Sequence, residues 1–437
     1  MTLPVFAADR LVASIETDRD GPLIRYADAW RAANDAFPIS LSMPLGADVH
    51  AADAVVPWLM NLLPEGEPLR AMTRALGVAR EDILGLIAET GRDLAGALTI
   101  GAPREQAVPS YRPIDDAAHL ERIIEELPAR PFLVGEAGIS MSLAGAQEKL
   151  PVALVGNAVA IPLDGAVSTH ILKPDNPRLS GSVQNEALCM VLARRCGLAV
   201  APVTTGRAGE RVFLLVDRYD RIATDAGVDR LHQEDFCQAL GRPPAAKYEH
   251  NGSGVRGPSL ADMFDLVRNH MTAREINALL DGVIFNIAIG NVDSHAKNYS
   301  ILLAPGRTRL APLYDLMSGL IWPNITQNHA QAIGGQQRGR HVHGRHWRRM
   351  AQLCGLSQPG VIRRLKALIT RLLAELPSAL AEVSAMPAGP HSTLTELAAA
   401  ITARANLVLT HALGPDDQAA PEAPEAEAPR RQTYGDV

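Results

Sequence analysis

The stretch GNVDSHAKNYSILL, residues 290–303, crowds reactive polar side chains against a predicted buried strand. Asp293 can accept a proton or orient a hydroxyl, and the side-chain carbonyl of Asn298 can hold a magnesium ion. His295 and Lys297 lie between these two residues. Because a strand that starts directly after Asn298 would anchor the loop, we interpret the stretch as a catalytic loop fixed to the core.

Asp293 and Asn298 are five residues apart, which is also the spacing in the catalytic loop of protein kinases. A kinase needs a second magnesium ligand further along the chain, and Asp315 lies 17 residues beyond Asn298, at the end of an apolar stretch. Leu316 and Met317 follow it where a kinase has Phe and Gly of the D-F-G motif, so the match is in the type of ligand and not in the literal sequence. Each of the three side chains alone is typical of helix capping or a turn. Their order and spacing together favour phosphate chemistry.

Lys173 ends a predicted strand, THILK, where a cation could bind phosphate oxygens. Glu186 follows 13 residues later, on the first turn of a predicted helix. A strand lysine followed by a helix glutamate resembles the ion pair that positions the lysine in kinases. Two alternatives stay open: the lysine can be a surface residue, and the glutamate can simply favour the N-terminus of its helix.

Three small residues, Ala144, Gly145 and Ala146, precede the next predicted strand. Without large side chains, the backbone amides of such a loop can approach a phosphate closely. The sequence is neither G-x-G-x-x-G nor a Walker A motif, so the loop carries little weight by itself. Ser140 and Ser142 lie at its edge, where a bound nucleotide could phosphorylate a hydroxyl.

The elements that must position these side chains belong to more than one domain. A chain of 437 residues, 47% of them hydrophobic, predicts two or three domains. The net charge of −6 gives no overall basic field, so a DNA contact would need a local patch or a partner. Four cysteines without a C-x-x-C pair predict reduced, buried thiols in a cytoplasmic protein. Neither a signal peptide nor a membrane span is expected.

A strand-rich half precedes a helix-rich half, an order that suits a two-lobed enzyme as well as other α+β proteins. The predicted regions are a small N-terminal α/β domain (1–104), a Pro-rich linker around one short helix (105–131), a strand-rich lobe (132–245), a helical lobe (246–413) and a tail (414–437). The tail is rich in Pro, Ala and Glu and is expected to be disordered.

Taken together, these motifs resemble the HipA-type serine/threonine kinases, the toxin half of bacterial type II toxin–antitoxin systems. The segments that carry the resemblance are SLAGAQEK (142–149), THILKPD (169–175), NEALCMVLARRCGL (185–198), VDRYDR (216–221), QEDFCQALG (233–241), GNVDSHAKN (290–298) and LAPLYDLMS (310–318). LSMPLG, NLLPEGEPLR and GRDLAGAL match the family's first domain. The similarity covers residues 1–413. It implies an α+β fold, with the N-terminal domain attached to a protein-kinase-like two-lobed body whose C-terminal lobe is helix-rich.

The resemblance also implies site residues, with ATP and Mg²⁺ as cofactors. Asp293 is expected to be the catalytic base, Asn298 and Asp315 the metal ligands, and Ser142 the autophosphorylated serine. The implied ATP-binding residues are Ala144, Gly145, Ala146, Gln147, Glu148 and Lys149 of a phosphate loop, Lys173, the hinge residues Asp217, Arg218 and Tyr219, and His295, Ala296, Lys297, Asn298, Tyr314 and Asp315. Family members usually carry Glu and Phe in place of Asp217 and Tyr219. Phosphorylation of Ser142 would add nearly two negative charges beside Lys173, and is expected to eject the loop and switch the enzyme off.

Partners follow from the same resemblance. The family's substrates are aminoacyl-tRNA synthetases, with glutamyl-tRNA synthetase the familiar case. Its usual partner is a HipB-type helix-turn-helix antitoxin that binds operator DNA, and the toxin acts as corepressor with it. In the basic run QRGRHVHGRHWRRM (337–350), Arg345, Arg348 and Arg349 are predicted DNA contacts, with a solvated surface loop as the alternative.

Two other functions remain open from the sequence. One is a catalytically silent, kinase-like corepressor of the antitoxin, which the presence of Lys173, Asp293, Asn298 and Asp315 disfavours. The other is a metal-dependent phosphohydrolase, which leaves the lysine strand and the small-residue loop unexplained.

Overall fold

A computed structural model describes residues 2–103, 110–156, 158–225 and 227–414. The chain divides into two compact units. Unit 1 comprises Met1–Pro174, Gly206–Ala245 and Ser300–Ala311, and unit 2 comprises Asp175–Thr205, Ala246–Tyr299 and Pro312–Val437. The predicted disordered tail, from residue 415 onward, lies outside the described residues.

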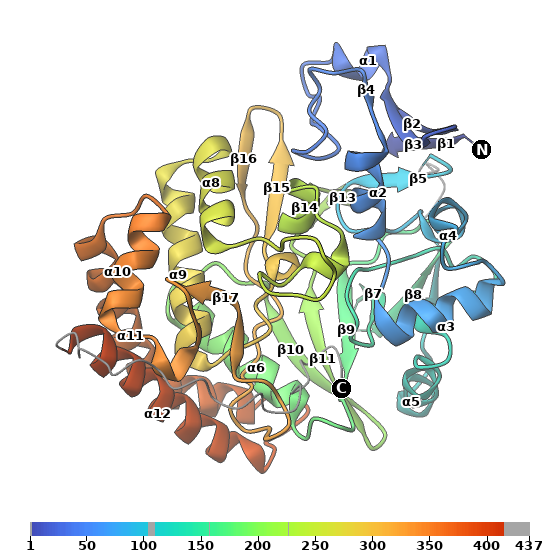
Figure 1. The fold of residues 1–437 in the computed structure, drawn as a ribbon. Helices are drawn as coiled ribbons and strands as arrows, with labels where there is room; N and C mark the ends of the chain where they lie inside the picture. The colour runs from blue at the N-terminus through green and yellow to red at the C-terminus, as the bar shows by residue number, and fades with distance from the viewer. Residues whose placement is uncertain (1, 104–109, 157, 226, 415–437) are drawn as a thin grey trace. The chain divides into compact units, whose positions relative to one another are not determined.

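Unit 1 begins with a five-stranded antiparallel sheet in the order β4-β3-β2-β1-β5 (Figure 1). Its strands are β1 (Leu3–Ala7), β2 (Arg10–Asp18), β3 (Gly21–Tyr26), β4 (Val49–His50) and β5 (Leu98–Ile100). The helices of this part are α1 (Asp28–Arg31), α2 (Ala52–Met60), α3 (Gly66–Leu76) and α4 (Ile83–Thr90). Alternate strand residues such as Val5, Ile15 and Ile24 are buried and share one core with Trp58 and Leu59 of α2. This period of two is the reason that the sheet has one buried face.

A six-stranded sheet in the order β10-β11-β9-β7-β8-β6 follows. Its strands are β6 (Ser110–Pro113), β7 (Leu150–Val155), β8 (Ala158–Leu163), β9 (His170–Pro174), β10 (Val203–Ala208) and β11 (Arg211–Asp217). The strand that was expected to carry Lys173 is therefore β9, a central strand between β11 and β7. Its neighbour Leu172 is fully buried and belongs to the core under the sheet.

The expectation of a linker around a single helix at 105–131 needs a correction. The expected helix is present as α5 (Ala117–Glu126), followed by the short helix η1 (Pro131–Leu133), but β6 precedes it and pairs with β8. Proline weakens a strand because it lacks an N–H donor, and Pro113 is tolerated here because β6 lies at the edge of the sheet.

The rest of unit 1 comprises two small sheets. They consist of the hairpin β12 (Arg221–Thr224) and β13 (Gly227–Arg230), and of β14 (His232–Asp235), β15 (Ser300–Ala304) and β16 (Arg307–Leu310), with the short helices α7 (Phe236–Ala239) and η2 (Pro244–Ala246). β15 is the buried strand predicted directly after Asn298. It pairs with β14 on one side and β16 on the other, which confirms that the loop before it is tied to a sheet.

Five buried charges join the N-terminal segment to the strands that follow β11. Asp93 bonds to Arg221 and Arg230, each at 3.0 Å. Asp220 receives two bonds from Arg218, at 3.1 and 3.0 Å, and an ion pair from Arg221 at 2.8 Å. All five side chains are at most 4% exposed. Burial by itself would raise the pKa of Asp93, but the arginine charges outweigh it and lower that pKa, so the carboxylate stays ionised.

A second buried contact between the same segments involves Glu234 of β14. Its carboxyl group bonds to the Ser40 hydroxyl at 2.5 Å and accepts the Leu41 N–H at 2.8 Å. Burial raises the pKa of Glu234 to about 8, so this group is largely protonated at neutral pH. Unlike Asp93, it therefore joins the two segments mainly as a neutral hydrogen-bonding group.

Unit 2 is mostly helical, but its boundaries differ from those of the predicted helical lobe, 246–413. It includes the helix Ser182–Arg195, which the prediction placed in the strand-rich lobe, whereas residues 300–311 belong to unit 1. Its elements are α6 (Ser182–Arg195), α8 (Leu260–His270), α9 (Ala273–Ile289), η3 (Ala296–Asn298), β17 (Asn328–Ile333), β18 (Gln336–Arg338), η4 (Gly339–His341), α10 (Gly344–Leu353), α11 (Gln358–Ser384) and α12 (Thr393–Leu413). α11 and α12 run side by side, and α6 and α9 both pack on α11 (Figure 1). Among the described residues, no helix is long and apolar enough to cross a membrane.

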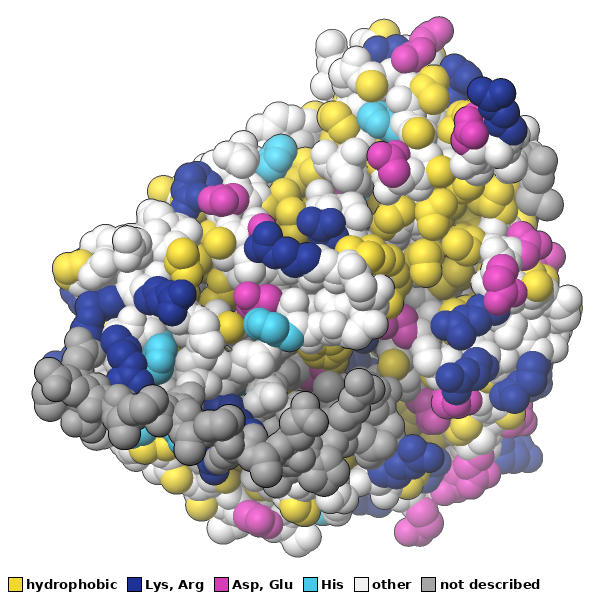
Figure 2. All heavy atoms as spheres, viewed as in Figure 1, with side chains coloured by type: hydrophobic (Ala, Val, Ile, Leu, Met, Phe, Trp, Pro, Cys, Tyr) yellow, Lys and Arg dark blue, Asp and Glu magenta, His cyan; other side chains and the backbone are white. Residues whose placement is uncertain are grey.

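The basic run 337–350 is not the irregular surface loop considered as an alternative. It continues from β18 through η4 into α10, where Trp347 and Met350 are buried. Arg345 and Arg348 are partly exposed on this helix and Arg349 is exposed. Figure 2 shows Lys and Arg side chains at the surface where α10 is drawn in Figure 1. Trp347 and Met350 are three residues apart, a helical spacing that the sequence analysis did not use.

Candidate active site

The candidate catalytic loop starts at a helix end that requires glycine. α9 stops at Gly290, whose φ is +69°, in the left-handed region. A Cβ atom there would lie 2.6 Å from the side chain of Leu320. The next residue, Asn291, uses its side-chain oxygen to accept the Asp293 N–H at 3.1 Å. The chain therefore turns sharply out of the helix and presents Asp293 at a fixed position.

Asp293 and Asn298 are brought together within this loop. The Asn298 side-chain N–H donates to the Asp293 carbonyl oxygen at 2.8 Å, and the His295 N–H donates to the same oxygen at 2.7 Å. Asp293 is only 8% exposed. The amide nitrogen of Asn298 is used within the loop. The side-chain oxygen is then the atom of Asn298 that could serve as a metal ligand.

Asp315 has a backbone conformation that non-glycine residues rarely adopt, with φ at +57°. The two residues before it are held by hydrogen bonds. The Tyr314 hydroxyl donates to the Lys297 carbonyl oxygen at 2.6 Å. The Leu313 N–H donates to the Ala199 carbonyl oxygen, and the Leu313 carbonyl oxygen accepts the Ala201 N–H. Strained conformations of this kind are found where a side chain must be aimed for function. Carboxylate and amide oxygens from Asp315 and Asn298 are ligands that suit Mg²⁺.

A residue that the sequence analysis missed also supports this segment. Asn185 of α6 donates to the Ser318 carbonyl oxygen and accepts the Ser318 N–H, both at 2.9 Å. The paired bonds fix the chain three residues beyond Asp315. Its neighbour Glu186, which was expected to position Lys173, is 1% exposed in the same helix. Asn185 begins one of the segments that carry the family resemblance, but the sequence assigned it no role of its own.

Lys173 in unit 1 is not the surface lysine considered as an alternative, because it is only 7% exposed. It lies on β9 opposite Leu214 of β11. A buried lysine is costly unless charged partners or ligands surround it, so its burial favours a functional role.

The small-residue loop closes on itself beside this strand. The Lys149 ammonium donates to the Ala144 carbonyl oxygen at 2.7 Å. Gly145 has φ of +106°, and a Cβ there would lie 2.7 Å from the Lys149 nitrogen. Its carbonyl oxygen accepts the Glu65 N–H at 3.0 Å. A residue without a side chain is therefore needed at 145.

Ser142, the predicted modification site, is fully buried in this conformation. Its hydroxyl donates to the Leu62 carbonyl oxygen at 2.9 Å, and its N–H donates to the Asp93 carbonyl oxygen at 3.2 Å. The hydroxyl can meet a phosphate donor only after this segment leaves its place.

The three predicted hinge residues make different contacts. The Asp217 carboxylate lies 3.1 Å from the ring of His170, and the Tyr219 hydroxyl bonds to Gln233. Burial raises the pKa of Tyr219. The Arg218 side chain is buried among the five charges described above, where it also donates to the Ser168 hydroxyl at 2.8 Å. Its guanidinium group is thus committed to internal contacts.

Two parts of the chain match the models of known protein families. Residues 3–101 match the model of the HipA N-terminal domain, and residues 141–380 match that of the HipA-like C-terminal domain. The second match alone covers more than half of the chain.

The chain belongs to the HipA family.

Individual HipA relatives agree with this assignment. The chain is 39% identical to Y4mE of Sinorhizobium fredii over 84% of this chain and 89% of the relative. It is 31% identical to the serine/threonine-protein kinase toxin HipA of Shewanella oneidensis, over 88% of this chain and 90% of that relative. The solved complex of Shewanella oneidensis HipA, HipB and operator DNA contains a chain with a TM-score of 0.79 and 28% identity, covering 94% of this chain and 96% of that one. The predicted α+β, kinase-like fold is confirmed, and the chain is a protein kinase of the HipA type by relationship.

The predicted HipA site residues divide between the two units. The loop 144–149, Lys173 and the hinge lie in unit 1, whereas Asp293, Asn298 and Asp315 lie in unit 2. Within unit 2 the structure brings Asp293 and Asn298, and Lys297 and Tyr314, into direct contact.

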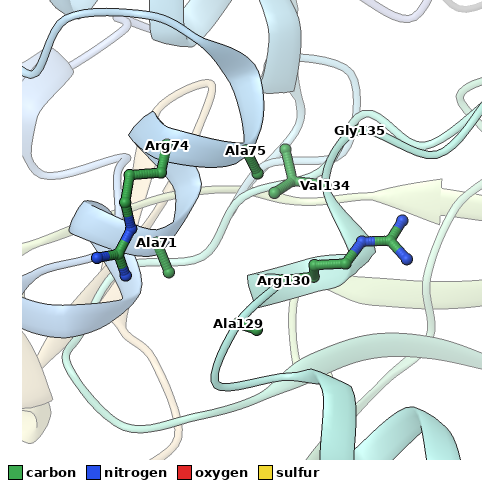
Figure 3. Close-up of a pocket in the computed structure, with 7 residues that line it drawn as sticks. All are labelled: Ala71, Arg74, Ala75, Ala129, Arg130, Val134 and Gly135. Carbon is green, nitrogen blue, oxygen red and sulfur yellow. The ribbon is translucent and has the colours of Figure 1, made fainter.

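One further cavity, of about 420 Å³, lies in unit 1 (Figure 3). It is lined by Ala71, Arg74, Ala75, Ala129, Arg130, Val134 and Gly135. None of these is a predicted site residue. Arg130 is already paired with Glu126 and Glu136, at 3.4 and 3.1 Å. We assign the cavity no part in the HipA site.

Proposed function

We propose that this protein is a HipA-type serine/threonine kinase toxin that transfers the γ-phosphoryl group of ATP to a protein hydroxyl. The observation that carries the proposal is the fixed catalytic loop, in which Asn298 is bonded to the backbone of Asp293. The family assignment and the toxin kinase that is 31% identical support the reaction class. The arrangement also gives no reason to prefer a phosphohydrolase, since Lys173 and the loop 144–149 would then have no role.

In the proposed reaction, the Asp293 carboxylate accepts the proton of the acceptor hydroxyl. The acceptor oxygen forms a bond to the γ-phosphorus, and the bond from that phosphorus to the β–γ bridging oxygen breaks, so that ADP leaves with both electrons of that bond. The same carboxylate would also orient the hydroxyl before the proton is transferred.

Each unit contains residues that are proposed to bind ATP or its metal. In unit 1, Lys173 and the amides of 144–149 would bind phosphate oxygens. Asp217, Arg218 and Tyr219 would border the adenine. Asn298 and Asp315 would hold Mg²⁺, which when bound neutralises phosphate charge. His295, Ala296, Lys297 and Tyr314 complete the proposed site.

Ser142 is the proposed site of autophosphorylation. Since its hydroxyl is buried against the backbone of Leu62, phosphorylation requires the loop to move out first. A phosphate with nearly two negative charges would not fit back into that buried position. The modified loop would then stay away from Lys173, and the kinase would be inactive.

Replacing Lys173 tests the proposed ATP site. Lys173→Met keeps most of the buried volume and removes the charge, so kcat/KM for ATP is expected to fall about 100-fold, as when one preorganised donor to a phosphate is lost. Transfer of label from ATP to the protein itself and to a generic acceptor measures this. Lys366→Met, at an exposed position on α11, is the matched control and should behave as the wild type. A Lys173 variant with full activity would remove the lysine from the proposed site.

The proposed partners are a HipB-type helix-turn-helix antitoxin and, through it, operator DNA. The solved relative that this chain matches over most of its length is in complex with HipB and operator DNA. The proposed acceptor protein is an aminoacyl-tRNA synthetase such as glutamyl-tRNA synthetase, which rests on the family alone. Phosphoproteomics after brief expression of the wild type and of an Asp293 variant would identify it.

DNA association is expected to depend on α10. Replacing Arg345, Arg348 and Arg349 together with Gln should reduce the salt dependence of operator binding by the toxin–antitoxin complex. Up to three phosphate contacts would be lost, so the slope of log K against log salt falls by up to about 2.7. Gel-shift titrations at several salt concentrations measure the slope.

The control carries the same change in charge at exposed positions of α9 and α11, namely Arg274, Arg363 and Lys366 replaced with Gln. If both triple variants give the wild-type slope, α10 does not touch DNA. If both reduce it equally, only the overall charge matters. A complex that still binds DNA but shows no phosphoryl transfer in any assay would favour the alternative, a catalytically silent corepressor.

A further inference from the structure

Tyr248 makes a direct contact with the proposed catalytic base. Its hydroxyl donates a hydrogen bond to Oδ1 of Asp293, 45 residues away in the sequence. Its ring packs edge-on against His295, with the ring centroids 5.2 Å apart and the planes at 87°. The Lys247 ammonium lies 5.6 Å from the centroid of the same ring. One side chain thus contacts both the base and another predicted ATP-site residue.

The segment that carries this tyrosine is firmly attached on both sides. The Ala296 N–H donates to the Lys247 carbonyl oxygen at 3.1 Å, so the segment bonds directly to the catalytic loop. The Glu249 N–H donates to the Ala330 carbonyl oxygen at 3.0 Å, and the Glu249 carboxylate accepts the Ala332 N–H at 2.7 Å. The last two contacts are with β17. A tyrosine between two such anchors has little freedom to swing away.

The same strand also holds the start of the catalytic loop. His329 of β17 is 3% exposed, and its Nδ1 lies 2.9 Å from the Asn291 carbonyl oxygen. Burial, together with the nearby Arg404 charge, lowers the pKa of His329 to about 3. The ring is therefore neutral at physiological pH and, with a carbonyl as its partner, Nδ1 is the protonated nitrogen. β17 is bonded both to the loop of Asp293 and to the segment of Tyr248.

We propose that Tyr248 is a positioning residue, which fixes the Asp293 carboxylate so that its second oxygen, Oδ2, faces the acceptor hydroxyl, with β17 as the common support. The inference rests on the proposed function of Asp293. A free aspartate side chain rotates about two bonds, and a hydrogen bond to one oxygen from an anchored donor removes that freedom. Because in-line transfer depends on alignment of the acceptor, loss of this restraint should reduce turnover more than substrate binding.

The test is Tyr248→Phe in the full-length chain, which keeps the ring contacts and removes only the hydroxyl. We expect kcat to fall about tenfold while KM for ATP stays within twofold of the wild type. Tyr111→Phe is the matched control. That tyrosine lies on β6, its hydroxyl bonds to the Val167 carbonyl oxygen at 3.2 Å, and it is no part of the proposed site. The control should retain wild-type kcat.

A double-mutant cycle separates positioning from a general structural effect. If Tyr248 acts through the carboxylate, adding Tyr248→Phe to Asp293→Asn should lower the small residual rate no further. A further tenfold fall in that background would show that the tyrosine supports the fold, and would overturn the inference.

The remaining outcomes are also decisive. Wild-type kcat in Tyr248→Phe overturns the inference and leaves the proposed function intact. A raised kcat overturns it as well, and shows that the tyrosine hydroxyl occupies the place of the acceptor and must leave. Absence of phosphoryl transfer in the wild type, under conditions where ATP binds, overturns the proposed function and the inference with it.

Discussion

Asp293→Asn is expected to lower the rate of phosphoryl transfer by a factor of about 1,000, within the range for loss of a positioned general base. The amide has the shape of the carboxylate but accepts a proton very poorly. It can still bond to the Tyr248 hydroxyl through its oxygen, so the local structure should persist. Labelled ATP with a generic acceptor gives the rate, and mass spectrometry of Ser142 reports autophosphorylation.

Further measurements test whether the loss of rate comes from misfolding or from loss of ATP binding. Thermal unfolding and binding of the antitoxin should match the wild type, because the backbone contacts of the loop remain. ATP binding should also persist, since Lys173 and Asp315 are unchanged. Label in Ser142 at the wild-type level would exclude Asp293 as the base.

Asp93→Ala is expected to reduce the free energy of unfolding of unit 1 by about 3–5 kcal/mol, the cost of removing one partner from a buried ionic network. Arg218, Arg221 and Arg230 would then lose the carboxylate that all three contact, at positions with little access to water. The same substitution removes the acceptor of the Ser168 N–H. Urea unfolding followed by fluorescence should show a transition midpoint at a lower urea concentration than in the wild type.

At acidic pH, the free energies of unfolding of Asp93→Ala and of the wild type should become more similar. In the folded protein the pKa of Asp93 is lowered from its ordinary value of 3.8. The carboxylate therefore contributes its stabilisation above pH 3.8 and loses it as the pH falls through the lower, folded value. Asp20→Ala, an exposed aspartate on the same unit, is the control and should change stability by less than about 0.5 kcal/mol. Equal stability of the Asp93 variant and the wild type would mean that the network is not a net stabilising feature.

Prediction from the sequence worked where the signal was local. The helices α9, α11 and α12 carry apolar residues at helical spacing, and Asp293 and Asn298 are only five positions apart in the sequence. It failed where a weak local signal was outweighed by pairing with distant residues. β6 has few apolar residues and a proline, and is a strand because β8 lies beside it. α10 was not predicted because its segment is rich in arginine and histidine, although Trp347 and Met350 have helical spacing.

The sequence alone therefore indicated the family and most of the main elements, and it predicted a base and metal ligands, because these depend on residue type and short spacing along the chain. The tertiary structure decided which side chains support them. Tyr248 reaches Asp293 across 45 residues, and His329 reaches Asn291 across 38. Asp93 meets Arg221 across 128 residues. Such contacts depend on how the folded elements pack against one another, and packing leaves no periodic trace in the sequence of either partner.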